Sequence, residues 1–282
     1  MTKYIKLSLV VTVLIFLTAC TAGDTQTGEN GSIIIAGSTT VTPLMRELQE
    51  VFMSQTGITV EVQEIGTSAG INATIDGISN IAMASRSMTE GEIERGIQPV
   101  PIALDGVAII VHYTNPVDNL TLDQIEAIFR GEINNWSQVG GENRAITVVS
   151  RELGSGIRSS FETFSGVRDQ FHINGHDVWI SGVYPHALIS SGTGGVLNSV
   201  SSNRGAVGYI TTGIENALIR SVAVDGVRFS AQTAQDGTYP FSNVFYLGIM
   251  DDLTPASRTF IDWVLSEQGQ FAVADAEFVP IN

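Results

Sequence analysis

Beyond residue 6 the sequence contains no lysine, since Lys3 and Lys6 are the only two among its 282 residues. Without lysine, the rest of the chain cannot hold nucleotide phosphates in a Walker-type loop or use a lysine nucleophile or Schiff base. Basic charge is scarce as a whole, because the twelve arginines beyond residue 20 face 29 acidic residues, a balance of −17. Nucleic acid is therefore not an expected partner, because basic residues supply most of the affinity for its backbone.

Cysteine occurs only once, at Cys20, so no disulfide can form within the chain and the fold must rest on packing. Long apolar runs are missing as well. The run at residues 7–19 has 13 residues, whereas a helix that spans a membrane needs about 20. Lys3 and Lys6 form a positively charged region before this run. A charged start followed by an apolar run of this length is typical of a signal peptide for export.

The apolar run ends in Leu17-Thr18-Ala19-Cys20, which resembles the lipobox of bacterial lipoproteins, where the cysteine becomes the lipidated N-terminus. An ordinary secretory signal with a chance cysteine is the alternative. Residues 21–31 contain no large apolar side chain, which is typical of a flexible tether. We therefore expect a signal peptide at residues 1–19, followed by a lipidated Cys20 and a tether that together span residues 20–31.

The rest of the sequence is typical of a globular, turn-rich protein, with 43% hydrophobic residues and 29 glycines in the whole chain. At roughly 100 to 200 residues per domain, the length allows one large domain or two ordinary ones. Short β-rich runs alternate with segments of helical periodicity, which predicts an α/β fold with largely parallel sheets. Strands are expected at residues 33–36, 58–65, 81–84, 106–112 and 146–150, and helices at residues 42–56, 71–75, 87–96, 121–131 and 157–164. Ser87 with Glu90 and Thr121 with Gln124 match capping boxes at the start of the third and fourth of these helices.

Three short loops, rich in glycine and hydroxyl groups, each follow an expected strand and precede an expected helix. They are Gly37-Ser38-Thr39-Thr40, Gly66-Thr67-Ser68-Ala69-Gly70 and Gly154-Ser155-Gly156. A helix N-terminus has unpaired N–H groups and partial positive charge, so it stabilises an anion without any lysine. One such loop alone is more often a simple helix cap. Three of them predict a shared ligand crevice, because parallel strands end on one side of a sheet.

Several motifs resemble the phosphate-binding proteins of bacterial ABC importers, a class of periplasmic binding proteins: GSTTVTPL, GTSAGI, IAMASRSMT, LTLDQIEAIFRGEINNWSQVGG, SRELGSGIRSSF and RGAVGYI. The resemblance covers nearly all of residues 32–282 and is specific as an ensemble. It implies an α/β Venus-flytrap fold of type 2, with two lobes of parallel or mixed sheets flanked by helices. Lobe 1 would comprise residues 32–110 and 213–282 and lobe 2 residues 111–212, with crossings near residues 107–111 and 206–210.

The same resemblance implies which residues bind the anion. Carried over position by position, they are Ser38, Thr39, Thr40, Thr67, Ser68, Arg151, Ser155, Gly156 and Ile157. Arg151 offers a planar, permanently charged fork suited to phosphate. Ile157 stands where some members offer another hydroxyl, so only its N–H remains. The alternative for Arg151 is a surface ion pair with Glu152 or another acid.

Arg86 is the main departure from the family. Well-known members have an aspartate at this position, which accepts the proton that phosphate keeps at neutral pH and so rejects sulfate. Arg86 either binds the anion itself or pairs with an acidic residue. Three acids are candidates to pair with Arg86, namely Glu152, Asp105 and Glu64. The same three are candidates to accept the phosphate proton in place of the missing aspartate. Without an acceptor, sulfate or a related oxyanion becomes an alternative ligand.

Two weaker patterns indicate other chemistry. Gly66-Thr67-Ser68-Ala69-Gly70 also matches the nucleophile elbow of serine hydrolases, with Ser68 as the nucleophile. Only two strands precede it, however, and no HGGG-type oxyanion segment does. His172 and His176 are four residues apart, as two metal ligands on one face of a helix would be. Asn174-Gly175 between them breaks a helix, however, so a surface loop is the better interpretation. We therefore expect no catalytic residue, no cofactor and no metal site.

The combined expectation is an exported lipoprotein, anchored by its N-terminal lipid to the extracytoplasmic face of a bacterial membrane. The family resemblance implies a monomer without enzymatic activity that binds inorganic phosphate between its lobes. It would deliver the phosphate to the permease subunits and the ATPase of an ABC importer.

Overall fold

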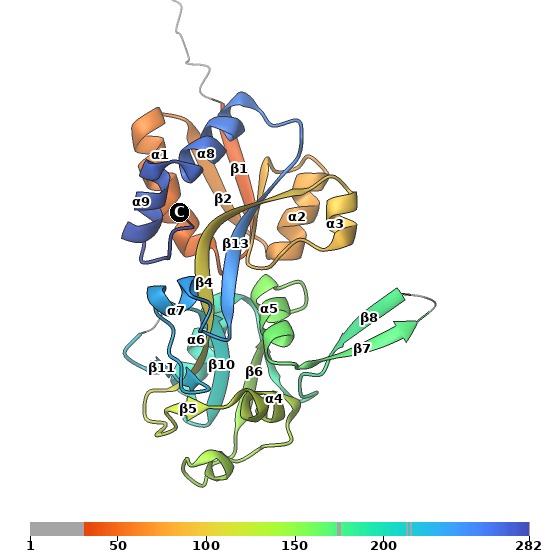
Figure 1. Cartoon of the computed structure of the whole chain (residues 1–282), viewed down its shortest axis with the longest axis vertical. Coiled ribbons are helices and arrows are strands. Elements are labelled where there is room, and N and C mark those ends of the chain that lie inside the picture. The colour runs from red at the N-terminus through yellow and green to blue at the C-terminus, as the bar shows by residue number, and fades with distance from the viewer. Residues whose placement is uncertain (1–30, 174–175, 213, 215, 282) are drawn as a thin grey trace, which may run out of the picture.

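The computed structural model describes residues 31–281, apart from residues 174, 175, 213 and 215. The predicted signal peptide, Cys20 and nearly all of the tether therefore lie outside the described residues. In Figure 1 the described chain forms two halves along the long axis, each with a sheet and its own helices. Strand β4 (Gln98–His112) runs from the upper half into the lower one. The expected two-lobed α/β fold with mixed sheets is confirmed.

The sheet of the upper half contains, in spatial order, β2 (Thr59–Glu64), β1 (Ser32–Gly37), β3 (Ile81–Ala84), β13 (Ser242–Ile249) and the first part of β4. Strand β1 runs parallel to β2 and β3, whereas β13 runs antiparallel to β3 and β4. The helices on its two sides are α1 (Thr42–Thr56), α8 (Pro255–Leu265) and α9 (Glu267–Asp275) on one, and α2 (Thr67–Ile75) and α3 (Glu90–Glu94) on the other (Figure 1).

The sheet of the lower half contains the second part of β4, β10 (Ala206–Thr211), β6 (Thr147–Arg151) and β9 (Leu188–Ser190), while β11 (Ile219–Ser221) also pairs with β4. Its larger helices are α4 (Leu122–Arg130), α5 (Gly156–Phe164) and α6 (Gly192–Ser202). The smaller elements are β5 (Asn119–Leu120), the 3-10 helix η1 (Trp136–Val139), β12 (Ala223–Val224) and α7 (Ala231–Gln235). A hairpin of β7 (Arg168–Ile173) and β8 (His176–Ser181) projects from this half (Figure 1). His172 and His176 thus lie on paired strands and not in a loop.

Strand β4 links the two halves. Residues 98–106 pair with β13, and residues 107–112 pair with β10 and β11. Each half has its own apolar core. In the upper core the rings of Phe52 and Phe260 meet edge to face at 5.0 Å, and in the lower core Phe161 stacks on Tyr209 at 4.1 Å.

The segment after β10 packs differently from what we expected. The predicted division assigns residues 213–282 to the upper lobe. In the structure, however, β11 and β12 pair with β4 and β5, and Tyr239 and Phe241 are buried in the lower core. Strand β10 itself stays in the lower sheet, so the second crossing lies at the start of β13 instead. Strands as short as β11 and β12 have too little periodicity for the sequence to reveal their partners.

Local sequence signals account for the ends of several helices. Pro43 lies in the first turn of α1, and Gly57 ends that helix with a φ of +70°. Helix α4 begins with a capping box of Thr121 and Gln124, as expected. None of the helices in the described part of the chain is long and apolar enough to cross a membrane.

The expected start of α3 is wrong by two residues. We expected a capping box of Ser87 and Glu90, but the residue that caps the helix is Thr89, paired with Glu92. Both pairs have the same spacing, so the sequence pattern alone does not separate them. With Thr89 as the cap, the carboxylate of Glu92 turns back toward the end of β3, where it bonds to the backbone of Thr89 and to Arg86.

Candidate functional site

Buried hydroxyl groups from three loops of the upper half meet between the two halves. Ser38 follows β1, Thr67 begins α2, and Ser85 follows β3, and each side chain is at most 2% exposed. The Ser38 hydroxyl donates to Ser85 Oγ at 2.9 Å, and the Ser85 and Thr67 hydroxyl oxygens lie 3.4 Å apart. These loops converge because β1 runs parallel to both β2 and β3. Ser85 is not among the ligand residues expected from the sequence.

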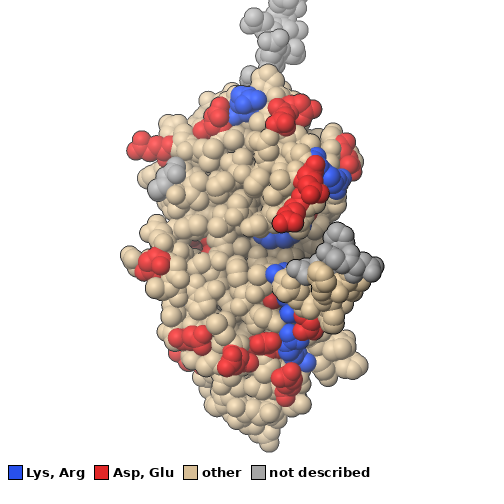
Figure 2. Space-filling view, turned by 45° about the vertical axis from the view of Figure 1, so that its right-hand side comes forward, with Lys and Arg blue, Asp and Glu red and all other residues tan. Residues whose placement is uncertain are grey.

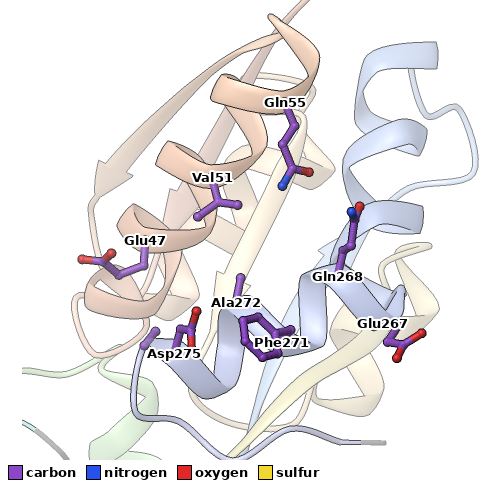
Figure 3. Close-up of a pocket in the computed structure, with 9 residues that line it drawn as sticks. Glu47, Val51, Gln55, Glu267, Gln268, Phe271, Ala272 and Asp275 are labelled. Carbon is purple, nitrogen blue, oxygen red and sulfur yellow. The ribbon is translucent and has the colours of Figure 1, made fainter.

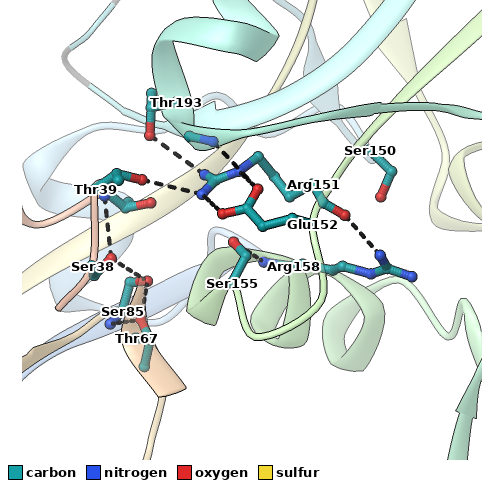
Figure 4. Close-up of polar contacts among 12 residues, drawn as sticks. Ser38, Thr39, Thr67, Ser85, Ser150, Arg151, Glu152, Ser155, Arg158 and Thr193 are labelled. Carbon is teal, nitrogen blue, oxygen red and sulfur yellow. Dashed lines mark hydrogen bonds and ion pairs between the residues drawn. The ribbon is translucent and has the colours of Figure 1, made fainter. Parts of the chain in front are cut away.

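The N-terminus of α5, which belongs to the lower half, reaches this group of hydroxyls (Figure 4). A Cβ atom on Gly156 would lie 2.4 Å from Thr67 Oγ1 and 2.5 Å from Ser85 Oγ, so only glycine fits there. Beside it, the backbone N–H of Ser68 donates to the carbonyl oxygen of Gly154 at 3.2 Å. The two halves therefore touch through polar groups at the start of a helix.

Arg151 connects the halves with its guanidinium group (Figure 4). It ends β6 and is only 2% exposed. One terminal nitrogen donates to Thr39 Oγ1 of the upper half at 3.1 Å, and the other donates to Thr193 Oγ1 at 3.5 Å. Thr193 was also missed, although it lies in the segment Ser191-Gly192-Thr193, which follows β9 and starts α6. The pattern of strand, small polar loop and helix was thus present a fourth time.

Glu152 forms a two-pronged ion pair with Arg151, with both N–O distances at 2.8 Å. The alternative for Arg151 was a surface ion pair, and the structure has this pair with the guanidinium buried. Burial alone would raise the pKa of the Glu152 carboxyl, but the hydrogen bonds and charge of Arg151 and the N–H of Gly192 lower it overall. Glu152 is therefore ionised at neutral pH and balances the charge of Arg151.

The other three predicted ligands are buried in the same region. Thr40 is 1% exposed, and its hydroxyl oxygen has no hydrogen-bond partner among the described residues. Ser155 is 2% exposed and accepts from the N–H of Arg158 as the cap of α5. Ile157 packs its side chain into the lower core, so only its backbone faces the start of the helix. Buried hydroxyls without a partner are rare in proteins, and Thr40 is therefore suited to a polar ligand.

Arg86 pairs with an acid that we did not consider. Its terminal nitrogens bind the two carboxylate oxygens of Glu92 at 2.7 and 2.8 Å. They also donate to the Ser87 carbonyl oxygen at 2.9 Å and to Ser68 Oγ at 3.1 Å. The three expected partners lie elsewhere. The sequence signal for Glu92 was the capping box of α3, which we placed two residues too early.

The candidate proton acceptors differ in their surroundings. Asp105 is fully buried where β4 passes between the halves and accepts from the hydroxyls of Thr211 and Thr212 at 2.5 and 2.7 Å. Burial raises its pKa to about 7, although these hydrogen bonds act in the opposite direction. Glu64 pairs with Arg46 on the surface. Of the three, only Glu152 is bonded to a predicted ligand.

The structure does not support the serine hydrolase alternative. The hydroxyl oxygen of Ser68 accepts from Arg86, which has no lone pair with which to take the hydroxyl proton. His112, the first histidine after Ser68, lies at the lower end of β4, where its Nδ1 is 2.8 Å from Thr114 Oγ1. Within the described ranges, no group of three or more His, Cys, Asp or Glu residues could hold a metal ion.

A cavity of about 620 Å³ lies away from this cluster, between α1 and α9 (Figure 3). Its lining includes the carboxylates of Glu47, Glu267 and Asp275 and the ring of Phe271, but no arginine. Carboxylates without a basic neighbour repel an anion. This cavity is therefore not an anion site.

Acidic side chains are spread over both halves of the surface in Figure 2, and basic side chains appear on both halves and also at the waist between them. The arginine of the cluster, Arg151, is buried there with the hydroxyl groups. Hydroxyl and backbone N–H donors at a helix start, together with a guanidinium, bind tetrahedral oxyanions. The cluster is thus suited to binding an anion.

Comparison with known proteins agrees with this chemistry. The sequence matches the PBP superfamily domain over residues 22–268. A solved structure from Clostridium perfringens, described as a phosphate ABC transporter substrate-binding protein with bound phosphate, is 36% identical. It covers 89% of this chain and 100% of its own, with a TM-score of 0.82.

Two further relatives are similar over most of the chain. An ABC-type phosphate transport receptor from Vibrio cholerae is 33% identical, covering 88% of this chain and 99% of its own, with a TM-score of 0.72. The phosphate-binding protein PstS of Pseudomonas aeruginosa is 27% identical and covers 90% of this chain and 84% of its own. These relatives are substrate-binding proteins and not enzymes. The chain belongs to the PBP superfamily, among the phosphate-binding substrate-binding proteins of ABC transporters.

Proposed function

We propose that this protein binds inorganic phosphate between its two lobes and delivers it to the permease and ATPase of an ABC importer. The observation that carries the proposal is the bridge from Arg151 to Thr39, which joins the halves through a buried guanidinium. Relatives described as phosphate receptors share the fold and most of the sequence length. The protein has no catalytic step of its own in this function.

The ligand set that we propose comprises donors from both lobes. Its members are Ser38, Thr39, Thr40, Thr67, Ser68, Arg151, Ser155 and the backbone N–H groups of Gly156 and Ile157. To these we add Ser85 and Thr193, because their hydroxyls bond to Ser38 and Arg151. Micromolar affinity corresponds to about 8 kcal/mol. Hydrogen bonds to a charged group contribute about 1.5 to 3 kcal/mol each before ordering costs. A few of these donors, held rigidly by buried loops, are therefore sufficient.

The finer features of the proposal concern the whole protein. We propose that Cys20 carries a lipid that anchors a monomer at the extracytoplasmic face of a bacterial membrane. The lobes hinge where β4 and the start of β13 pass between the halves. Their closure around phosphate would give the permease a form to distinguish from the empty one.

Calorimetry of the purified protein tests this function. We expect phosphate to bind with micromolar or tighter affinity, and Arg151→Gln to weaken it at least about tenfold, because one charge-assisted bond is lost. Sulfate is titrated in parallel as the alternative oxyanion. Absence of phosphate binding by the unmodified protein would refute the proposal, and tighter binding of sulfate would make it a sulfate carrier.

A further inference from the structure

We propose that Arg86 is a positioning residue, which the carboxylate of Glu92 holds in place so that it directs the hydroxyl proton of Ser68 toward the bound anion. Arg86 does not contact the anion itself. This inference rests on the proposed function. It assigns a role to the position at which well-known members of the family have an aspartate.

The hydrogen bonds of Arg86 leave few donors for an anion. Its two terminal nitrogens carry four N–H groups, and four contacts to the protein use them: two to Glu92, one to the Ser87 carbonyl and one to Ser68. Only the Nε–H is left over. The side chain is 11% exposed and Glu92 is 14% exposed, so the pair lies largely inside the molecule. A guanidinium with this many partners is fixed in orientation.

Glu92 is itself held by a second contact. One of its carboxylate oxygens accepts from the backbone N–H of Thr89 at 2.8 Å, as part of the capping box of α3. Burial alone would raise the pKa of Glu92, but the bonds to Arg86 and Thr89 lower it overall. The carboxylate stays charged at neutral pH and neutralises Arg86. Helix α3 therefore acts as the support for the guanidinium.

The bond to Ser68 decides where that hydroxyl points. A hydroxyl that accepts from a guanidinium can still donate its own proton, and it must do so away from the guanidinium. Ser68 lies in the first turn of α2, and its Cβ would lie 3.6 Å from a Cβ built on Gly154 in the loop of the lower half. Its side chain is thus at the contact between the lobes, next to the start of α5. A proton fixed in this direction is preorganised for an anion at that contact.

A double-mutant cycle separates positioning from direct binding. The variants are Ser68→Ala, the double change Arg86→Met with Glu92→Gln, and all three changes together. Removing the arginine and the glutamate as a unit avoids leaving a buried charge unpaired. We expect Ser68→Ala and the double change each to weaken phosphate binding about tenfold, since each removes one oriented hydroxyl bond. The triple variant should be weakened by the same factor of about ten.

Direct contact between Arg86 and the anion predicts a different result. The two losses would then multiply to about a hundredfold in the triple variant, and this would overturn the inference. Arg86→Lys is a milder test, because lysine keeps the charge but cannot hold Glu92 and Ser68 in one plane. We expect it to lose affinity about tenfold, and unchanged affinity would contradict the inference.

The matched control is Arg46→Met with Glu64→Gln, which removes an ion pair of the same composition from the same lobe. That pair is exposed, at 56% and 40%, and lies outside the cluster, so phosphate affinity should not change. Thermal unfolding of every variant shows whether it is folded. If the unmodified protein binds no phosphate, the proposed function fails, whereas binding with multiplying losses refutes only the role of Arg86.

Discussion

At the scale of single residues, the site depends on one buried cation and on groups small enough to surround it. Arg151 is 2% exposed and has Glu152, Thr39 and Thr193 as partners, so its charge is balanced inside the protein. Burying a guanidinium without such partners would be costly. The residues that offset the cost of burying the guanidinium also hold it in a fixed orientation.

Gly156 is a residue of the cluster at which size matters. In Gly156→Ala the added methyl group would overlap Thr67 Oγ1 and Ser85 Oγ, at 2.4 and 2.5 Å. Overpacking costs about 1 to 3 kcal/mol, so we expect phosphate affinity to fall about tenfold or more in calorimetry as the lobes are held apart. Gly194→Ala is the control, because a Cβ there meets nothing within 4 Å. Equal affinities in the two variants would show that α5 does not need to approach the hydroxyls.

At the scale of elements, the sheet order explains why the loops meet. Ser38 and Ser85 come together because β1 and β3 are parallel neighbours, although 47 residues separate the two hydroxyls. The alternation of strands and helices was readable from the sequence, and it located the loops at 37–40, 66–70 and 154–156. Ser85 was missed because a lone serine after a strand carries no signal of its own. Glu92 was missed because Ser87 with Glu90 and Thr89 with Glu92 both fit the spacing of a capping box, and only the second pair forms one.

Strand β4 carries a prediction about pH. Burial raises the pKa of Asp105 to about 7, from the 3.8 that is ordinary for an aspartate. Between these values the folded state holds a proton that the unfolded state has lost, so the contribution of Asp105 to stability is complete below pH 4. This contribution is lost as the pH rises toward 7, by up to about 1.4 kcal/mol per pH unit.

Asp105→Asn tests this prediction, because an asparagine can still bond to Thr211 and Thr212 but does not ionise. Between pH 4.5 and pH 8 we expect the unfolding temperature of the unmodified protein to fall relative to that of the variant. A difference that stays constant over this range would mean that Asp105 is ionised throughout, with water or a cation beside it.

At the scale of the whole molecule, the charge of −17 beyond residue 20 and the binding of an anion are compatible. Acidic groups are spread over the surface of both halves (Figure 2), where salt screens them over about 8 to 10 Å. The donors of the cluster are buried and act at hydrogen-bond distance. Short-range bonds therefore decide affinity, and the surface field acts on the encounter.

The association rate of phosphate should consequently rise as salt is added at low ionic strength, because screening weakens the repulsion from the acidic surface. Stopped-flow measurements of intrinsic tryptophan fluorescence at several salt concentrations can follow it, with a neutral osmolyte as the control for viscosity. A rate that falls with salt would mean that the field at the entrance of the cleft is positive.

The sequence by itself determined the fold class, the three polar loops, the acidic balance and the family resemblance, because each depends on local pattern and composition. Only the tertiary structure decided which acid pairs with Arg86, that Thr193 joins Arg151, and that residues 219–241 pack on the lower core. These contacts join residues whose partners are set by sheet order and helix starts. Several arrangements satisfy the same local pattern, and packing of the whole chain selects one of them.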